Sequence, residues 1–206
     1  MIRQLLESCI RNISGAIGIR LRRMYYTKRL GACGDKLTIS EGVYFENPKC
    51  IQLGNHVWID RGCKLIAGKV TSNNIATKET NDQIATGEII IGEQSHIGIN
   101  TIIQGHGGVH IGAYFTSSPD TKIYSLSNNV SHSKKGTHTI DNNDRHYILS
   151  PIKIGKNVWL GANSFMVGGS IGADTFVHPF SLVNGHHEPN SVLAGKPAIK
   201  IKTRFK

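Results

Sequence analysis

Residues 154–165 read Ile-Gly-Lys-Asn-Val-Trp followed by Leu-Gly-Ala-Asn-Ser-Phe, and residues 171–182 read Ile-Gly-Ala-Asp-Thr-Phe followed by Val-His-Pro-Phe-Ser-Leu. In each unit of six, an aliphatic residue comes first and a small or branched residue comes fifth. An α-helix repeats its apolar residues every 3.6 positions and a half-buried strand every 2, so neither explains a period of six. Hexapeptide periodicity is typical of a parallel β-helix, in which each unit forms one short side of a coil.

The same spacing occurs earlier in the chain, which indicates that one coil makes up most of the protein. Residues six apart continue the pattern in three further segments: Leu53, Ile59 and Leu65; Ile91, Ile97 and Ile103; Ile111, Ser117 and Ile123. We expect these residues to point into the coil. We also expect the glycines that follow many of them to help the chain turn its corners. The predicted fold class is therefore all-β, with the coil running over residues 35–186.

Composition and charge bound the function. A chain of 206 residues suits one domain with appended arms, and the low aromatic content of 7% suits a narrow core of Ile, Val and Leu. The formal net charge of +10 indicates an anionic partner: nucleic acid, anionic lipid, or a phosphate-bearing cofactor or substrate. No run of about 18 apolar residues is present, so no membrane-spanning helix is predicted. Four cysteines lack the spacing of metal ligands and are expected to be reduced thiols in a cytoplasmic protein: Cys9, Cys33, Cys50 and Cys63.

Residues 1–34 differ from the coil and are expected to form a basic, amphipathic helical arm. Apolar residues recur there at three- and four-residue steps: Ile2, Leu5, Leu6, Cys9, Ile10, Ile13 and Ile17. Six arginines and Lys28 accompany them, against the single acid Glu7. The arm either docks on the end of the coil or on a neighbouring subunit, or it lies as an interfacial helix on the cytoplasmic leaflet of a membrane through residues 1–29. A secretory signal is disfavoured, because Ser14 and Gly15 interrupt the apolar run.

Two polar segments lose the six-residue spacing and are expected to be insertion loops, at residues 67–88 and 125–150. Loops on a rigid scaffold often carry substrate contacts. The second loop holds His132, His138 and His146, with almost no apolar residue to bury. A structureless segment of that length in a compact protein is usually either functional or disordered.

The chain ends in a basic tail, residues 187–206, in which positions 189–198 read Pro-Asn-Ser-Val-Leu-Ala-Gly-Lys-Pro-Ala. Together with the hexapeptides of 154–182, this ending resembles the hexapeptide-repeat acyltransferases, in the branch of galactoside, maltose and polysaccharide O-acetyltransferases. The resemblance covers roughly residues 35–200. It implies a left-handed parallel β-helix, an exception to the usual right-handed crossover. It also implies a homotrimer with acetyl-CoA bound at the subunit boundaries.

A cofactor site at this end also has a physical basis, because Lys and Arg side chains suit the phosphates of acetyl-CoA. The resemblance implies that Gly161 and Ala162 lie beside the pantetheine and the thioester, and that Lys200 lies near the phosphates. Along the length of the cofactor it implies a further set: Pro179, Asn184, Ala194, Gly195 and Lys196. The sequence departs from the family pattern at His178-Pro179, where a Gly-Ala pair is usual, and at Gly185, where lysine is common.

The implied reaction needs a general base that takes the proton from a sugar hydroxyl, and histidine suits this role near neutral pH. A backbone N–H near Gly161 or Ala162 is expected to stabilise the oxyanion. At the position where the family pattern places the histidine, this sequence carries Asn129, which cannot accept a proton at useful pH. The base is then His132, or one of the other loop histidines, His138 and His146, or it is missing.

A sugar acceptor needs several polar groups around it, and Asp60, Asn100 and His106 are the residues expected on the acceptor side. The main hypothesis is an acetyl-CoA-dependent O-acetyltransferase acting on a cell-surface polysaccharide or its precursor, and N-acetylation of an amino sugar is the variant. An inactive protein and a metal-dependent enzyme like the γ-class carbonic anhydrases are alternatives. The latter has His106 and His110 close in sequence but no third zinc ligand, so no metal is expected. Binding of nucleic acid is not expected either, because no aromatic residues interleave with the basic ones.

Overall fold

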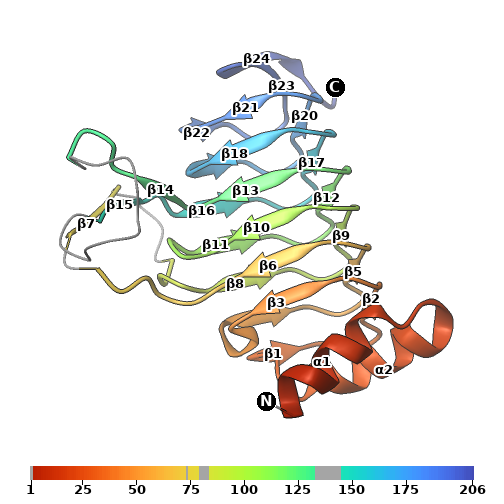
Figure 1. Ribbon diagram of the computed structural model, residues 1–206. Helices are drawn as coiled ribbons and strands as arrows, with labels where there is room; N and C mark the ends of the chain where they lie inside the picture. Colours follow the sequence, from red (N-terminus) through yellow and green to blue (C-terminus); the bar gives the residue numbers. More distant parts are fainter. Residues whose placement is uncertain (1, 73, 79–83, 133–144) are drawn as a thin grey trace.

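The computed structural model of the protein describes residues 2–72, 74–78, 84–132 and 145–206, and it contains a parallel β-helix built from three sheets (Figure 1). The first sheet contains β1 (Ala32–Cys33), β4 (Ile51–Leu53), β8 (Ile89–Ile91), β11 (Val109–Ile111), β16 (Ile152–Ile154), β19 (Gly169–Ile171) and β22 (His186–His187). The second contains β2 (Thr38–Ile39), β5 (Trp58–Ile59), β9 (His96–Ile97), β12 (Thr116–Ser117), β17 (Trp159–Leu160), β20 (Phe176–Val177), β23 (Ser191–Gly195) and β24 (Ala198–Thr203). The third contains β3 (Tyr44–Glu46), β6 (Lys64–Ile66), β10 (Ile102–Gln104), β13 (Lys122–Tyr124), β18 (Phe165–Val167) and β21 (Leu182–Val183).

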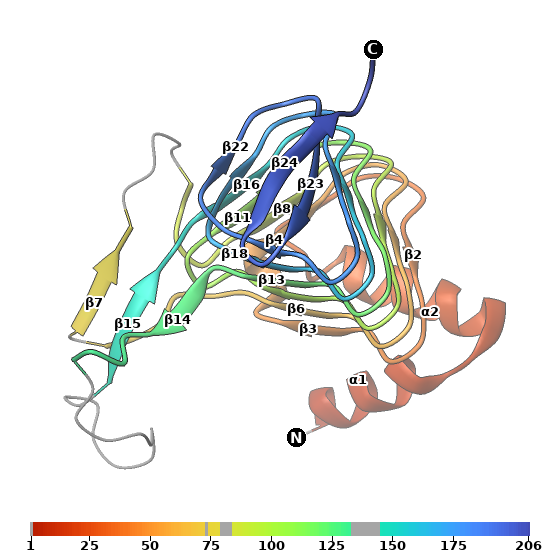
Figure 2. The ribbon, with the colours of Figure 1, turned by 90° about the horizontal axis from the view of Figure 1, so that it is seen from above.

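The chain visits the three sheets in turn, and Figure 2, seen along the coil, shows the triangular cross-section that results. The turn that leads from the first sheet to the second sheet is called the first corner. The turn from the second sheet to the third sheet is the second corner, and the turn from the third sheet back to the first sheet is the third corner. One inward residue per strand fills the core. In the second sheet these residues are Ile39, Ile59, Ile97, Ser117, Leu160, Val177 and Leu193.

Ser117 is the polar member of that column, and its burial confirms the place that the six-residue spacing predicted for it. Its hydroxyl lies 3.0 Å from Thr101 Oγ1 and accepts a hydrogen bond of 3.0 Å from the N–H of Gly98. A buried hydroxyl is tolerated when it is hydrogen-bonded in this way. The spacing therefore holds even where the inward side chain is not aliphatic.

The corners repeat from one turn to the next. At the second corner, Asn100, Asn163 and Phe180 adopt positive φ angles of 57°, 55° and 60°. The N–H of each donates to a carbonyl one turn below, those of Arg61, Pro119 and Ala162. The repeat therefore needs one left-handed residue at this corner in each of these turns.

The prediction that the glycines of the hexapeptides provide this turn is wrong at Gly155 and Gly161. A Cβ on Gly161 would lie 2.5 Å from the backbone N of Pro179, and one on Gly155 would lie 2.5 Å from the backbone N of Ala173. The positive φ angle occurs two residues later in each unit, for example at Asn163. These glycines therefore permit close packing between successive turns, and an asparagine, which tolerates the left-handed region, makes the corner.

The two insertions meet beside the coil. Both leave and rejoin it at the third corner, and they form a separate sheet of β7 (Asn74–Thr77), β14 (Leu126–Asn128) and β15 (His146–Leu149). β14 and β15 are antiparallel, and β7 adds to β15 in parallel (Figure 2). The prediction of a structureless segment at 125–150 is therefore wrong for its described part. The partner strand comes from the other insertion, which no local pattern reveals.

The N-terminal arm consists of two helices, α1 (Ile2–Asn12) and α2 (Gly15–Thr27), which lie across the first turn of the coil (Figure 1). The inner face of α2 is buried through Arg22, Tyr25 and Tyr26. The predicted docking on the end of the coil thus occurs, but of the predicted apolar stripe Ile10 packs against the core, whereas Leu5 and Ile17 are exposed. A short 3-10 helix, Pro48–Cys50, completes the helical elements of the described residues. Among those residues, no helix is long and apolar enough to cross a membrane.

Arg22 fixes the arm to the coil. Its guanidinium is fully buried and donates to the carbonyls of Ile39 in the coil, at 2.8 Å, and of Ile13 after α1, at 2.6 Å. The carbonyls of Ile10 and Arg11 accept further bonds of 3.0 and 3.3 Å. The last carbonyls of a helix have no partner within the helix, so Arg22 satisfies the end of α1 while it holds α2. Burial lowers the pKa of Arg22 from its ordinary value.

The predicted tail at 187–206 is part of the coil. The boundary falls inside β22, and the chain then forms the antiparallel hairpin β23–β24, whose strand β23 lies on β20 in the second sheet. Asn190 holds the last residues by accepting from the N–H of Phe205 at 2.7 Å. The basic residues at this end therefore stand on an ordered hairpin.

Candidate functional site

The second corner brings together most of the residues predicted for the cofactor. Gly161 and Ala162 form this corner after β17, and Pro179 lies one turn above, where the N–H of Phe180 donates to the carbonyl of Ala162 at 2.9 Å. One turn higher, β23 ends at Gly195, whose N–H lies 3.3 Å from the hydroxyl of Ser181. The predicted residues that stack along this edge are Gly161, Ala162, Pro179, Ala194, Gly195 and Lys196.

Positive charge gathers at the upper end of this edge. Lys196 occupies the turn between β23 and β24, and Lys200 and Lys202 follow on β24, all three exposed. Cations grouped on a rigid hairpin suit the recognition of phosphate groups. Lys200, predicted near the phosphates, thus lies on β24, the strand that follows the Ala194–Lys196 turn.

The N–H groups at this corner differ in availability. The N–H of Gly161 donates to the carbonyl of Val177 at 2.8 Å, so it is already engaged in the stacking of the turns. For the N–H of Ala162, no acceptor is found among the described residues. Of the two donors considered for the oxyanion, Ala162 is therefore the one that remains.

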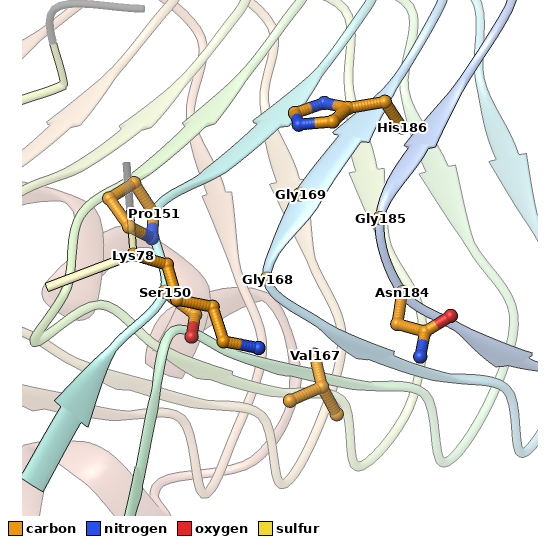
Figure 3. Close-up of a pocket in the computed structure, with 9 residues that line it drawn as sticks. All are labelled: Lys78, Ser150, Pro151, Val167, Gly168, Gly169, Asn184, Gly185 and His186. Atoms are coloured by element: carbon orange, nitrogen blue, oxygen red, sulfur yellow. The ribbon is translucent and has the colours of Figure 1, made fainter. Parts of the chain in front are cut away.

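Asn184, also predicted for the cofactor, lies at the third corner and is not brought to this edge. It lines a cavity of about 340 Å³ beside the inserted sheet (Figure 3). Lys78, which follows β7, reaches this cavity from the insertion, and His186 reaches it from the top turn. The Nδ1 of His186 is 2.8 Å from the hydroxyl of Ser170. Asn184 lies at the third corner because the strand β21 (Leu182–Val183) separates it from the second corner.

The predicted catalytic residues lie on the inserted hairpin. Asn129 follows β14, and its N–H donates to the carbonyl of His146 at 2.8 Å. The Nδ1 of His132 is 3.1 Å from the Oδ1 of Asn129, and the rings of His132 and His146 are 5.8 Å apart. His138 lies outside the described residues. Because a carbonyl oxygen only accepts, the Nδ1 of His132 carries the proton in this arrangement, and its Nε2 is left as a proton acceptor.

A second cavity, of about 550 Å³, lies between the third sheet and the inserted hairpin. Its lining consists of Gln104, Tyr124, Leu126, Ser127, Asn128, Tyr147, Phe165 and Val167. Tyr124 and Phe165 meet edge to face at 5.1 Å between ring centres. The buried Oε1 of Gln104 has no hydrogen-bond partner among the described residues.

Sequence reasoning missed this cavity. Its floor consists of outward-facing residues of β10, β13 and β18, which alternate with the inward Ile103, Ile123 and Met166. Strict alternation along each strand marks those positions as facing outward. The strands β14 and β15, which cover these outward-facing residues, belong to the insertion, and the sequence does not indicate that they pack there.

Within one chain, the three residues predicted on the acceptor side lie at two different corners. Asp60 Oδ2 is 2.9 Å from the Nε2 of His96 on the second sheet, and Asn100 forms the second corner in its own turn. His106 lies at the third corner, where its Nδ1 is 2.7 Å from the carbonyl of Gly68. Asp60 and Asn100 thus share the second corner in neighbouring turns, where the N–H of Asn100 donates to the carbonyl of Arg61 at 3.1 Å, and their role toward an acceptor stays a prediction.

The two histidines considered as zinc ligands have separate partners. His106 bonds to the carbonyl of Gly68, whereas the Nε2 of His110 bonds to Glu88 Oε1. Within the part of the chain that the structure describes, no group of three His, Cys, Asp or Glu side chains converges on a point. A catalytic zinc needs three protein ligands, so these residues offer no basis for a metal mechanism.

The architecture defines a class of protein, the hexapeptide-repeat β-helix, although no protein-family model matches the sequence. A point variant of AntD, an N-acyltransferase from Bacillus cereus in complex with dTDP-4-amino-4,6-dideoxyglucose and coenzyme A, matches with a TM-score of 0.73 and 23% identity, over 90% of this chain and 89% of that one. AntD with dTDP and 3-hydroxybutyryl-CoA gives 0.73 and 24%, over 89% and 88%. The hexapeptide-repeat acetyltransferase VCA0836 from Vibrio cholerae, complexed with acetyl-CoA, gives 0.60 and 20%, over 96% and 82%. These likenesses establish the fold.

Proposed function

We propose that this protein is an acetyl-CoA-dependent acetyltransferase that modifies a hydroxyl group of a sugar, in a cell-surface polysaccharide or its precursor. The observation that carries the proposal is the second corner, where the Gly161–Ala162 turn and the basic hairpin β23–β24 lie along one edge of the coil. The donors bound by the neighbouring folds are coenzyme A derivatives, which supports the same donor here.

The donor would lie along this edge. Lys196 and Lys200 would contact its phosphates, since ammonium groups bind them as point charges. The thioester would then lie near Ala162, whose N–H is the remaining donor for the oxyanion. Asn184 does not lie on this edge of the same chain, because it lines the cavity at the third corner.

The acceptor would lie on the inserted hairpin. The Nε2 of His132 takes the proton of the sugar hydroxyl as its oxygen attacks the thioester carbonyl. Asn129 holds the imidazole in the required tautomer through the 3.1 Å contact to Nδ1. The tetrahedral intermediate then expels the thiolate of coenzyme A, which receives the proton, and the products are a sugar ester and free coenzyme A. A donor N–H at the oxyanion contributes on the order of 3 kcal/mol to such a step.

One chain does not bring these two halves together. The hairpin projects from the third corner, whereas Gly161 and Ala162 lie at the second (Figure 2). We therefore propose a homotrimer of left-handed coils, in which the hairpin of one subunit faces the second corner of its neighbour. The partner copy then supplies half of each site.

The cavity below the hairpin supports a neutral acceptor. Its lining of three aromatic rings, two aliphatic side chains and the polar Gln104, Ser127 and Asn128 includes no charged residue. Sugar rings bind against aromatic faces with a few polar groups that orient their hydroxyls. N-acylation of an amino sugar is the second candidate, which the sugar nucleotide in the AntD complex favours.

Release of free thiol from acetyl-CoA, with a panel of glycans and nucleotide-linked sugars as acceptors, tests the proposal. We expect turnover by the wild-type protein, loss of turnover in His132→Ala with acetyl-CoA binding retained by calorimetry, and normal turnover in the control His56→Asn at the exposed first corner. Turnover that survives in His132→Ala moves the base to another loop histidine. Activity gained only in Asn129→His means that the base is missing, and failure to bind acetyl-CoA refutes the transferase.

A further inference from the structure

The two N-terminal helices present apolar side chains that no other described residue of the chain covers. The helices and the link between them carry five large apolar side chains that are exposed: Leu5 and Leu6 on α1, Ile13 in the link, and Ile17 and Met24 on α2. Leu5, Ile17 and Met24 are 67%, 72% and 59% exposed. Single exposed apolar residues are ordinary, but several on one short helical pair mark a surface for interaction.

This face cannot turn inward without breaking the arm. The opposite face of α2 is held by the buried Arg22 and by Tyr26, whose hydroxyl donates to Glu7 at 3.1 Å. Gly18 packs so closely that a Cβ there would lie 1.8 Å from the carbonyl oxygen of Ile13. The rotation of α2 is therefore fixed with Ile17 and Met24 pointing outward.

The charge around the exposed residues is mainly positive, and Asp35 is the exposed acid that lines a pocket with Arg23, Met24 and Lys28. Arg20, Arg23 and Lys28 are exposed on α2 and its end, beside Ile17 and Met24. Glu7, the one acid among residues 1–34, is turned inward, where it pairs with Arg11 at 3.2 Å and accepts from the tyrosines. The outer surface is thus apolar and cationic.

We infer that this surface, formed by Leu5, Leu6, Ile13, Ile17, Arg20, Arg23, Met24 and Lys28, docks the protein on an anionic lipid bilayer. Apolar side chains of an interfacial helix enter the boundary between headgroups and acyl chains, and each nearby cation adds about 1 kcal/mol of attraction to anionic lipid. A second copy of the same surface is disfavoured, because it would oppose its own cations. The inner leaflet of the cell membrane carries such lipid and would hold a cytoplasmic protein.

The docked orientation follows from the fold. The helices lie at the N-terminal end of the coil, and the hairpin β23–β24 lies at the other end (Figure 1). The coil would therefore stand on the membrane, with the basic hairpin directed away from it. This inference does not depend on the proposed chemistry.

Cosedimentation with vesicles tests the inference. The full-length protein is mixed with vesicles of phosphatidylcholine containing about 30% phosphatidylserine, and with vesicles of phosphatidylcholine alone. We expect binding to the anionic vesicles that weakens as salt is raised, since screening reduces surface attraction. The double variants Ile17→Ser with Met24→Ser, and Arg20→Glu with Arg23→Glu, should each lose about tenfold in affinity.

The matched controls lie outside the N-terminal helices. Ile199 and Ile201 on β24 are 64% and 50% exposed, so Ile199→Ser with Ile201→Ser changes similar side chains elsewhere. Lys156→Glu with Lys206→Glu, which changes two exposed cations outside the arm, is the charge control. Both should bind as the wild type does, and circular dichroism should show all variants folded. Four results would each overturn the inference. They are no binding to anionic vesicles, equal binding to neutral vesicles, unchanged binding by the helix variants, and a change in the oligomeric state of the helix variants instead of a loss of vesicle binding.

Discussion

The Nδ1 of His132 lies 3.1 Å from the Oδ1 of Asn129, so the histidine and the asparagine that stands at the family's histidine position form one unit. From the sequence, His132 is predicted as the base, and Asn129 occupies the position where the resemblance places a histidine. In the proposed mechanism the contact gives them different tasks: Asn129 would orient the ring, and His132 would keep Nε2 as the proton acceptor. Two experiments follow from this pair.

Asn129→Ala should lower kcat by about tenfold with little change in KM, because the base loses the partner that fixes its tautomer and orientation. Steady-state kinetics with the acceptor identified from the panel measure both constants. Val130→Ala, a change at the neighbouring exposed residue, is the control. An unchanged kcat in Asn129→Ala would remove the orienting role.

Asn129→Asp should move the acidic limb of the pH–rate profile to higher pH. A carboxylate beside the imidazole favours its protonated form, and the proton acceptor is then lost at a higher pH as the solution is acidified. The profile of kcat/KM against pH, measured beside the wild type, checks the direction. A profile that does not move would place the base elsewhere.

Gln104→Leu should raise the KM for the acceptor by about tenfold and leave the unfolding free energy nearly unchanged. The buried Oε1 of Gln104 has no partner among the described residues, so its loss leaves no protein donor unpaired. Phe165→Leu, which changes the same cavity without touching a polar group, gives the matched comparison. A large loss of stability with no effect on KM would make Gln104 a structural residue only.

Gly161→Ala should lower the unfolding free energy by about 3 kcal/mol, because its Cβ would lie 2.5 Å from the backbone of Pro179. The turns at this corner must then separate. Urea denaturation measures the loss, with Ala162→Ser at the next position as the control. A loss below that of the control would show that the turns have room to adjust.

Cys63 should resist thiol reagents in the folded protein, because burial raises its pKa to about 12 and leaves the unreactive thiol. Cys9 and Cys50 are exposed and should react in the folded protein. Mass spectrometry after brief alkylation locates the modified residues, and alkylation in denaturant should label all four. Rapid labelling of Cys63 without denaturant would contradict its buried place in the coil.

The coil could be predicted from the sequence because its period repeats, so that an exception such as Ser117 is still placed by its neighbours six residues away. The stacking of Gly161, Ala162 and Pro179 could be predicted for the same reason. Neither the inserted sheet nor the cavity beside it could be predicted in this way. The pairing of Tyr147 with Ile75 joins segments from different insertions, and such long-range contacts leave no local periodicity.

The arm shows the opposite difficulty. The stripe that contains Leu5 and Ile17 has helical spacing, and helical spacing alone does not say which face meets the coil. The decisive residue is Arg22, which sequence reasoning counts as a surface charge but whose guanidinium satisfies carbonyls at the end of α1. Because four backbone acceptors compensate its burial, a charged residue occupies the core side beside Tyr25 and Tyr26, while Leu5 and Ile17 face out.

Both insertions leave the coil at the third corner, and each returns to it in register: β6 and β10 pair residue by residue across one insertion, as do β13 and β18 across the other. Each turn of the coil contacts only its neighbours, so a change of length at this corner need not disturb the second corner. Segments that would recognise the acceptor and residues that would hold the donor are thus encoded in separable parts of the chain. If the proposed function holds, acceptor preference could therefore change by exchange of inserted segments without a change at the edge proposed for the donor.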